Sequence, residues 1–301
     1  RSTPSCAVIR PQACATSWRC AAIRRKAIER GLITAGADVS QIANATIRAA
    51  DKAFTFVLND EGFTEAVWLM TQLAIAAKKE NLGEHLQSLG VNLPQDTSLP
   101  DLAAAVSEAL DNKLESNGGR SDLGEMSQRA LVGALVEHIS PKLPSLFAPG
   151  PDDVRAALAA LGKKREFGEL SRTFFAKLTN ESMNYFLSKT LATHLGEGQR
   201  FATMNEMGQF EKALNTHCKE ASLIVEQFSA DWFSKHRYEE GGDISRESSN
   251  GFASYALKKM KDELKTTFVF STHDQKIVGE AEIIYSLEDG QLIGKEVKGV
   301  K

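Results

Sequence analysis

The sequence predicts a mainly α-helical fold, a multi-helix globular bundle with a small β-hairpin at its C-terminal end. From about residue 40 to residue 264, apolar side chains recur three or four positions apart, the spacing that gathers them on one face of a helix. Glycine and proline clusters separate these stretches, as loops between helices would. With 301 residues, 42% of them hydrophobic and 25% charged, the chain can bury a large core without metal or disulfide support.

Residues 1–39 differ in composition from the rest of the chain and are expected to be flexible or non-native. Seven Arg or Lys residues stand against one Glu in residues 1–31, which also hold Cys6, Cys14 and Cys20. The intervals of eight and six residues between these cysteines do not resemble the close pairs of structural zinc sites. Three interpretations stay open: sequence added for expression or translated from upstream, a natural basic arm, or a targeting peptide. No function is inferred from it.

Residues 40–140 are predicted to form an N-terminal helical subdomain. Four stretches have helical periodicity: 40–58, 63–77, 99–114 and 122–139. The second is apolar on more than one side, which indicates a central core helix. Ser98 precedes the third stretch, where its hydroxyl can accept hydrogen bonds from free amides, and Pro100 suits an early helical position. Pro141 and Pro144 end the fourth stretch.

Residues 141–151 are predicted to be a Pro-rich linker, because residues 140–151 hold four of the eight prolines. Residues 152–267 are then expected to form a second helical subdomain. Its core should be organised around large rings, since 13 of the 22 aromatic residues lie between Phe167 and Tyr255.

The elements expected in this second half follow the same logic. Pro151 opens a short helix. Thr179 is expected to cap a helix that Gly196 ends. Residues 205–237 form the longest periodic stretch, predicted as one helix with an apolar seam along most of its length. Another helix follows around 252–264, and 268–301 is expected to be a β-hairpin, with its turn at Asp289-Gly290, or a tail.

The candidate residues for catalysis or metal binding are His194, His217, Cys218 and His236. Neighbouring residues on a helix point about 100° apart, so His217 and Cys218 do not form a nucleophile pair, and Cys218 is interpreted as a core residue. A metal site built from His194, His217 and His236 is also disfavoured. On one straight helix His217 and His236 would lie about 28 Å apart, so they could not bind the same ion. We therefore predict no catalytic residue, metal site or cofactor.

One basic run in the body of the chain is a candidate nucleic-acid site. It consists of Lys163, Lys164, Arg165, Arg172 and Lys177. Aromatic residues interleave it, and basic residues alternating with rings can bind single strands by phosphate pairing and base stacking. The interpretation we favour is a solvated helix end with core aromatics (Phe167, Phe174, Phe175) behind it.

The leading functional hypothesis is a non-enzymatic, cytoplasmic helical protein-interaction or scaffold protein. Its partner, another protein or a second copy, would contact the long seam at Phe210, Leu214, Phe228 and Trp232. One alternative is a nucleic-acid-associated accessory protein, although the chain beyond residue 31 is acidic, which argues against a broad nucleic-acid surface. A second alternative is an enzyme or metal protein with a dispersed site. No apolar run has the length of a membrane span, so we expect no membrane partner.

Overall fold

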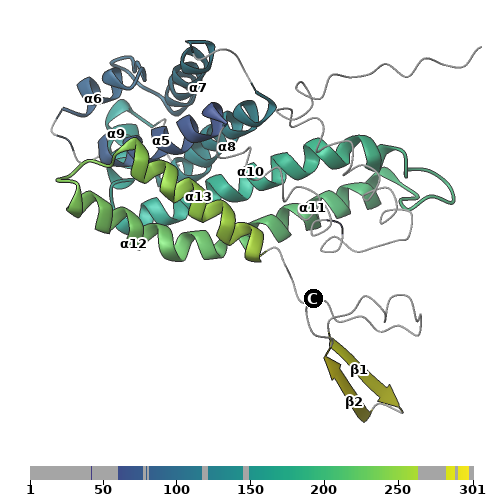
Figure 1. Cartoon of the computed structure of the whole chain (residues 1–301). Coiled ribbons are helices and arrows are strands. Elements are labelled where there is room, and N and C mark those ends of the chain that lie inside the picture. The colour runs from purple at the N-terminus through teal and green to yellow at the C-terminus, as the bar shows by residue number, and fades with distance from the viewer. Residues whose placement is uncertain are drawn as a thin grey trace, which may run out of the picture. The chain divides into compact units, whose positions relative to one another are not determined.

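The computed structural model describes residues 42, 60–76, 79, 81–116, 121–144, 149–263, 283–288 and 291–297. The chain divides into two compact units, Arg1–Lys265 and Thr266–Lys301. In its described residues the first unit is mostly helix, which confirms the mainly α prediction (Figure 1). Apart from Ile42, which is buried, the helix predicted at 40–58 lies outside the described residues.

The described helices of the first unit are α5 (Glu61–Ala76), α6 (Leu82–Ser88), α7 (Leu99–Ser116), α8 (Asp122–Ile139), the 3-10 helix η1 (Ser140–Lys142), α9 (Pro151–Ala160), α10 (Lys164–Ala192), α11 (Met204–Ala221), α12 (Leu223–Glu239) and α13 (Arg246–Glu263). In the second unit, β1 (Ile283–Glu288) pairs antiparallel with β2 (Gln291–Val297), and the register shifts between Ser286 and Leu287.

Side-chain caps explain where several helices begin. The amide of Asp101 donates to Ser98 Oγ over 3.3 Å, as predicted, and the Asp101 carboxylate accepts from the Ser98 amide over 2.9 Å. Ser121 caps α8 by accepting from the Gly124 amide over 2.8 Å. Pro151 occupies the first position of α9, where its missing N–H costs nothing. Local chemistry therefore fixes these helix starts.

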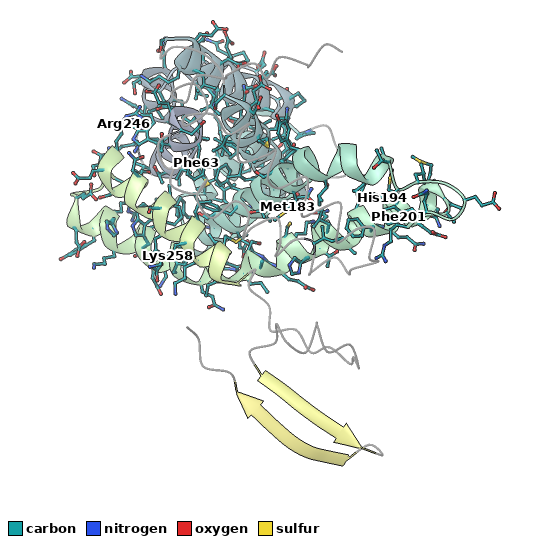
Figure 2. The ribbon with its side chains drawn as sticks, turned by 45° about the vertical axis from the view of Figure 1, so that its right-hand side comes forward. Phe63, Met183, His194, Phe201, Arg246 and Lys258 are labelled. Carbon is teal, nitrogen blue, oxygen red and sulfur yellow. The ribbon has the colours of Figure 1, made fainter. Side chains whose placement is uncertain are left out.

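Helix α5 is buried on nearly every side, as its apolar sequence predicts, and it packs against α7, α8 and α13. Three polar contacts join it to the start of α13. Arg246 donates to both carboxylate oxygens of Glu65 at 2.5 and 3.1 Å, Thr71 Oγ1 and Ser249 Oγ lie 2.9 Å apart, and Gln72 Nε2 donates to the Ile244 carbonyl over 3.0 Å. Figure 2 labels Arg246 and the core residue Phe63. Helices on both sides of the predicted linker, 141–151, thus contribute to one hydrophobic core.

Helix α10 is the longest described helix, and it corrects the prediction that a new helix begins at Thr179. Thr179 lies inside α10, which runs unbroken from Lys164 to Ala192. The helix continues through Thr179 because residues before and after it are packed in the core. Phe175 and Leu178 are buried before it, and Met183 and Leu187 are buried after it. Tertiary burial here outweighs the weak helix propensity of a β-branched residue.

The loop between α10 and α11 reverses the chain (Figure 2). The Phe201 amide donates to the His194 carbonyl over 3.0 Å, and the Gly196 amide donates to the Phe201 carbonyl over 2.9 Å. Gly196 and Gly198 have φ values of +132° and +74°, a conformation that side-chain-bearing residues rarely adopt. The predicted end of the helix at Gly196 therefore falls within this turn, four residues beyond the last residue of α10.

The prediction of a single helix over residues 205–237 is wrong. The structure has two helices, α11 and α12, that meet at Ser222. The Ser222 hydroxyl donates to the Lys219 carbonyl over 2.7 Å, and the Val225 amide turns back to the Ser222 carbonyl over 3.0 Å. At this residue, these local bonds replace the regular hydrogen-bond pattern of an α-helix. Because Ser222 keeps a near-helical backbone, α11 and α12 follow one another along α10 (Figure 1).

None of the described helices combines the length and the apolar character that a transmembrane span requires.

Candidate binding groove

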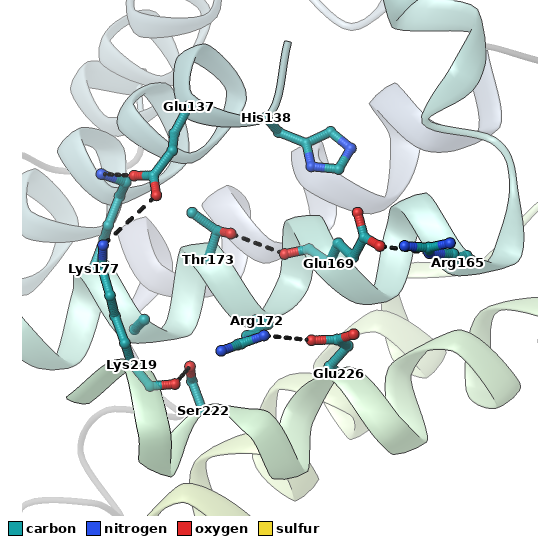
Figure 3. Close-up of a pocket in the computed structure, with 11 residues that line it drawn as sticks. Glu137, His138, Arg165, Glu169, Arg172, Thr173, Lys177, Lys219, Ser222 and Glu226 are labelled. Atoms are coloured by element: carbon teal, nitrogen blue, oxygen red, sulfur yellow. Dashed lines mark hydrogen bonds and ion pairs between the residues drawn. The ribbon is translucent and has the colours of Figure 1, made fainter. Parts of the chain in front are cut away.

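A charged groove of about 540 Å³ lies among α8, α10 and the junction of α11 with α12 (Figure 3). Polar and charged side chains make up most of its lining. The lining residues are Glu137, His138, Arg165, Glu169, Arg172, Thr173, Ala176, Lys177, Lys219, Ser222 and Glu226.

The spacing of residues along α10 explains why this groove is polar. Arg165, Glu169, Arg172 and Ala176 are three or four positions apart, so they share one face of the helix. The buried aromatic rings lie on the opposite face, with Phe167 packed 4.3 Å from the ring of Phe233. One helix thus separates a dry core from a charged groove.

Ion pairs connect the walls of the groove across helices. Arg172 donates to Glu226 of α12 over 2.9 Å, and Lys177 lies 2.7 Å from Glu137 of α8. Lys219 of α11 also approaches Glu137, at 3.8 Å, so two lysines share this carboxylate. The hydrogen bond from Lys177 is the main reason that the pKa of Glu137 is lowered. The lining holds four Arg or Lys side chains against three carboxylates.

A second cluster of ionisable groups adjoins the groove at the C-terminal end of α8. His138 Nε2 lies 2.7 Å from Glu166 Oε2 and 2.6 Å from Lys142 Nζ, and Lys142 also contacts Glu166. Burial, followed by the charge of Lys142, lowers the pKa of His138. Burial acts to raise the pKa of Glu166, but bonds from Lys142 and His138 outweigh it and lower that pKa. The net effect favours the neutral form of the imidazole.

His138 and Glu166, together with Glu169, have the geometry of a metal-binding group. One ligand atom from each side chain lies within 4.8 Å of the other two. In the part of the chain that the structure describes, no other set of three His, Cys, Asp or Glu side chains meets this condition.

The predicted nucleic-acid residues are divided by the structure. Arg165, Arg172 and Lys177 line the groove, and Lys164 pairs with Asp231 outside its lining. Lys163 lies in the turn before α10. The rings expected to interleave this run are fully buried in the core (Phe167, Phe174, Phe175). They are not accessible to stack on bases.

The predicted partner-contact residues pack mainly against the chain's own core. Leu214 is fully buried, and Phe210 is buried with its ring 5.5 Å from that of Phe201. Phe228 and Trp232 are half-buried and contact the ring of Phe252. The apolar seam thus contributes to the internal packing of the first unit.

The residues considered for catalysis lie in separate environments. His194 is in the turn after α10, whereas His217 and Cys218 are in α11. Burial raises the pKa of the Cys218 thiol to about 12, so its reactive thiolate form is scarce near neutral pH. His236 places its Nδ1 3.0 Å from the Trp232 carbonyl, and its ring lies 4.8 Å from the Trp232 ring at an interplanar angle of 30°. Cys218 therefore has the properties of a core residue.

Sequence reasoning missed the carboxylates and the histidine of this region (Glu137, His138, Glu166, Glu169, Glu226). A partial signal existed, because Glu166 and Glu169 are three residues apart within the basic run and so share a helix face. Nothing in the sequence placed His138 opposite them, since that depends on how α8 packs on α10.

The chain was compared with known proteins by sequence and by structure. No family model matches the sequence, and comparisons with curated proteins and with solved structures likewise gave no match.

Proposed function

We propose that this chain is a non-enzymatic binding protein whose groove receives an anionic segment of a partner protein. One observation carries the proposal: Lys177 and Lys219 converge on the single carboxylate of Glu137, at 2.7 and 3.8 Å. Among the residues that line this end of the groove, two lysines therefore meet a single carboxylate. A carboxylate or phosphate group from a partner would complete the pairing.

The energetics of the existing pairs favour such an exchange. Lys219 and Glu137 are half exposed, and exposed ion pairs contribute only about 0 to 1 kcal/mol. Moving Lys219 from Glu137 to a partner's anion thus costs little. Positive side chains at the edge of a groove also attract anions over distance, which speeds association more than it strengthens the final complex.

The groove differs from the contact first expected from the sequence. Phe210, Leu214, Phe228 and Trp232 are engaged in the core, so the seam is a poorer docking surface than the groove. We therefore place the partner contact at Lys177 and Lys219 and keep the interaction role. A cytoplasmic location remains a prediction from the sequence.

A protein partner suits the groove better than a nucleic acid. Glu137, Glu169 and Glu226 alternate with the basic side chains, and they would repel the evenly spaced phosphates of a strand. The buried rings of α10 provide no surface for base stacking. A protein segment with a few separated acidic groups avoids both problems.

Fluorescence anisotropy of the full-length chain at low ionic strength tests this proposal. The probes are a labelled peptide with two glutamates separated by neutral residues and a labelled single-stranded DNA of the same charge. We expect the peptide to bind more tightly than the DNA, and to bind about tenfold more weakly after Lys177→Glu with Lys219→Glu, because both attractive charges are reversed.

The matched control is Lys235→Glu with Lys258→Glu, which changes the net charge equally at exposed positions outside the groove lining. It should leave peptide binding unchanged. Equal loss in both double variants would show that only net charge matters. Tighter binding of DNA, or no peptide binding, would also reject the proposal.

A further inference from the structure

The cluster at the C-terminal end of α8 contains a cation between metal-type ligands. Lys142 follows α8 in η1, and its Nζ contacts both His138 Nε2 and Glu166 Oε2. These two ligand atoms are 2.7 Å apart, and an oxygen of Glu169 lies within 4.8 Å of both. An ammonium group thus occupies the place between an imidazole nitrogen and a carboxylate where a metal ion would be coordinated.

We propose that His138, Glu166 and Glu169 bind one divalent transition-metal ion, with Zn²⁺ as the reference ion, in exchange for the Lys142 ammonium. Two of these ligands, His138 and Glu169, also line the groove, but the lysines to which we assign partner binding are not part of the metal site.

The donor set suits such an ion. One imidazole nitrogen and two carboxylate oxygens are common ligands of zinc, and three protein ligands leave one position open. Arg165 bonds Glu169 Oε1, which leaves the second oxygen of that carboxylate for the ion. The His138 side chain is only 6% exposed, so its ring is already held in place, and the order imposed on it by the metal would cost little.

The exchange is also physically accessible. The Lys142 side chain is 29% exposed and lies on a three-residue helix, so it can turn toward solvent without disturbing α8. When the metal replaces the ammonium, the two glutamates keep a positive partner.

The competition between Lys142 and the ion gives a test that separates a metal site from a purely structural cluster. If the cluster is only structural, Lys142→Ala removes an ion pair and does not change zinc affinity. If it binds metal, Lys142→Ala removes the competing cation, and zinc affinity should rise about tenfold or more.

Isothermal titration calorimetry with Zn²⁺ measures this on the full-length chain without an affinity tag. All proteins carry Cys6→Ser, Cys14→Ser and Cys20→Ser, because thiolates bind zinc. We expect one zinc per chain in this background, tighter binding after Lys142→Ala, and at least tenfold weaker binding after His138→Gln or Glu166→Gln. His236→Gln is the matched control and should change nothing.

Thermal unfolding with and without Zn²⁺ gives a second readout, since an ion that binds only the folded chain raises the melting temperature. The rise should be largest for Lys142→Ala and absent for His138→Gln. The proposal is overturned if Lys142→Ala binds no stoichiometric zinc, or if His138→Gln binds it as tightly as the parent.

Discussion

The two faces of α10 contact very different surroundings although they belong to one helix. On one face, Phe167, Phe174 and Phe175 are fully buried among other rings. On the other, Arg165 and Arg172 form ion pairs along an open groove. The first face gains free energy from the area and fit of its side chains, whereas pairs on the second are screened by water. Stability and binding can therefore be changed separately on this helix.

The largest effect should come from the dry face. Phe167→Ala removes a ring that lies 4.3 Å from Phe233 and 5.9 Å from Phe252, and it leaves a cavity. We expect the free energy of unfolding to fall by about 3 to 5 kcal/mol in urea titrations. Tyr238→Ala is the control, because Tyr238 is 89% exposed and its loss should change stability by less than about 0.5 kcal/mol. Similar losses in both variants would contradict the comparison.

A smaller effect is expected where α10 crosses α12. A Cβ added at Gly168 would lie 3.0 Å from the Glu226 carbonyl oxygen and 3.2 Å from Ala230 Cβ. Gly168→Ala should therefore lower the free energy of unfolding by about 1 to 3 kcal/mol, because the helices must separate.

The control for this substitution should change the free energy of unfolding in the opposite direction. Gly208 lies inside α11 with nothing within 4 Å of an added Cβ, so Gly208→Ala should raise stability by about 0.5 to 1 kcal/mol through helix propensity. Urea unfolding measures both changes. Stabilisation by Gly168→Ala would show that the crossing is looser than described.

The smallest effect is expected on the groove face. Arg172 and Glu226 are 36% and 34% exposed, so a double-mutant cycle with Arg172→Ala and Glu226→Gln should give a coupling of about 0 to 1 kcal/mol. Raising the salt concentration should reduce it further. A coupling above about 2 kcal/mol that persists in high salt would mean that the pair behaves as a buried one, and the contrast between the faces would fail.

Local sequence signals located the helices well where caps and periodicity agreed. The stretch 122–139 matches α8 residue for residue, and the start at Leu99 agrees with the Ser98 cap. Thr179 and Ser222 show the limit of such signals. A hydroxyl residue can cap a helix, lie within one, or interrupt one, and packing by residues distant in sequence decides among these outcomes.

The candidate groove was predictable only in part for the same reason. The basic side chains of α10 stood out as a run, and their shared helix face follows from their spacing. Their carboxylate partners lie on other helices: Arg172 pairs with a residue 54 positions away, and His138 meets one 28 positions away. Periodicity along a single helix contains no information about such pairs.

The contacts between α5 and α13 determine how late in synthesis the chain can complete its core. Glu65 and Arg246 are 181 residues apart, and Thr71 and Ser249 are 178 apart. A ribosome adding about 5 to 20 residues per second needs roughly 10 to 40 s to cover that interval. Throughout it the apolar surface that α13 covers stays open to chaperones and to other nascent chains. Pairings of such long range are also formed slowly in refolding, because a large loop must close before they contribute.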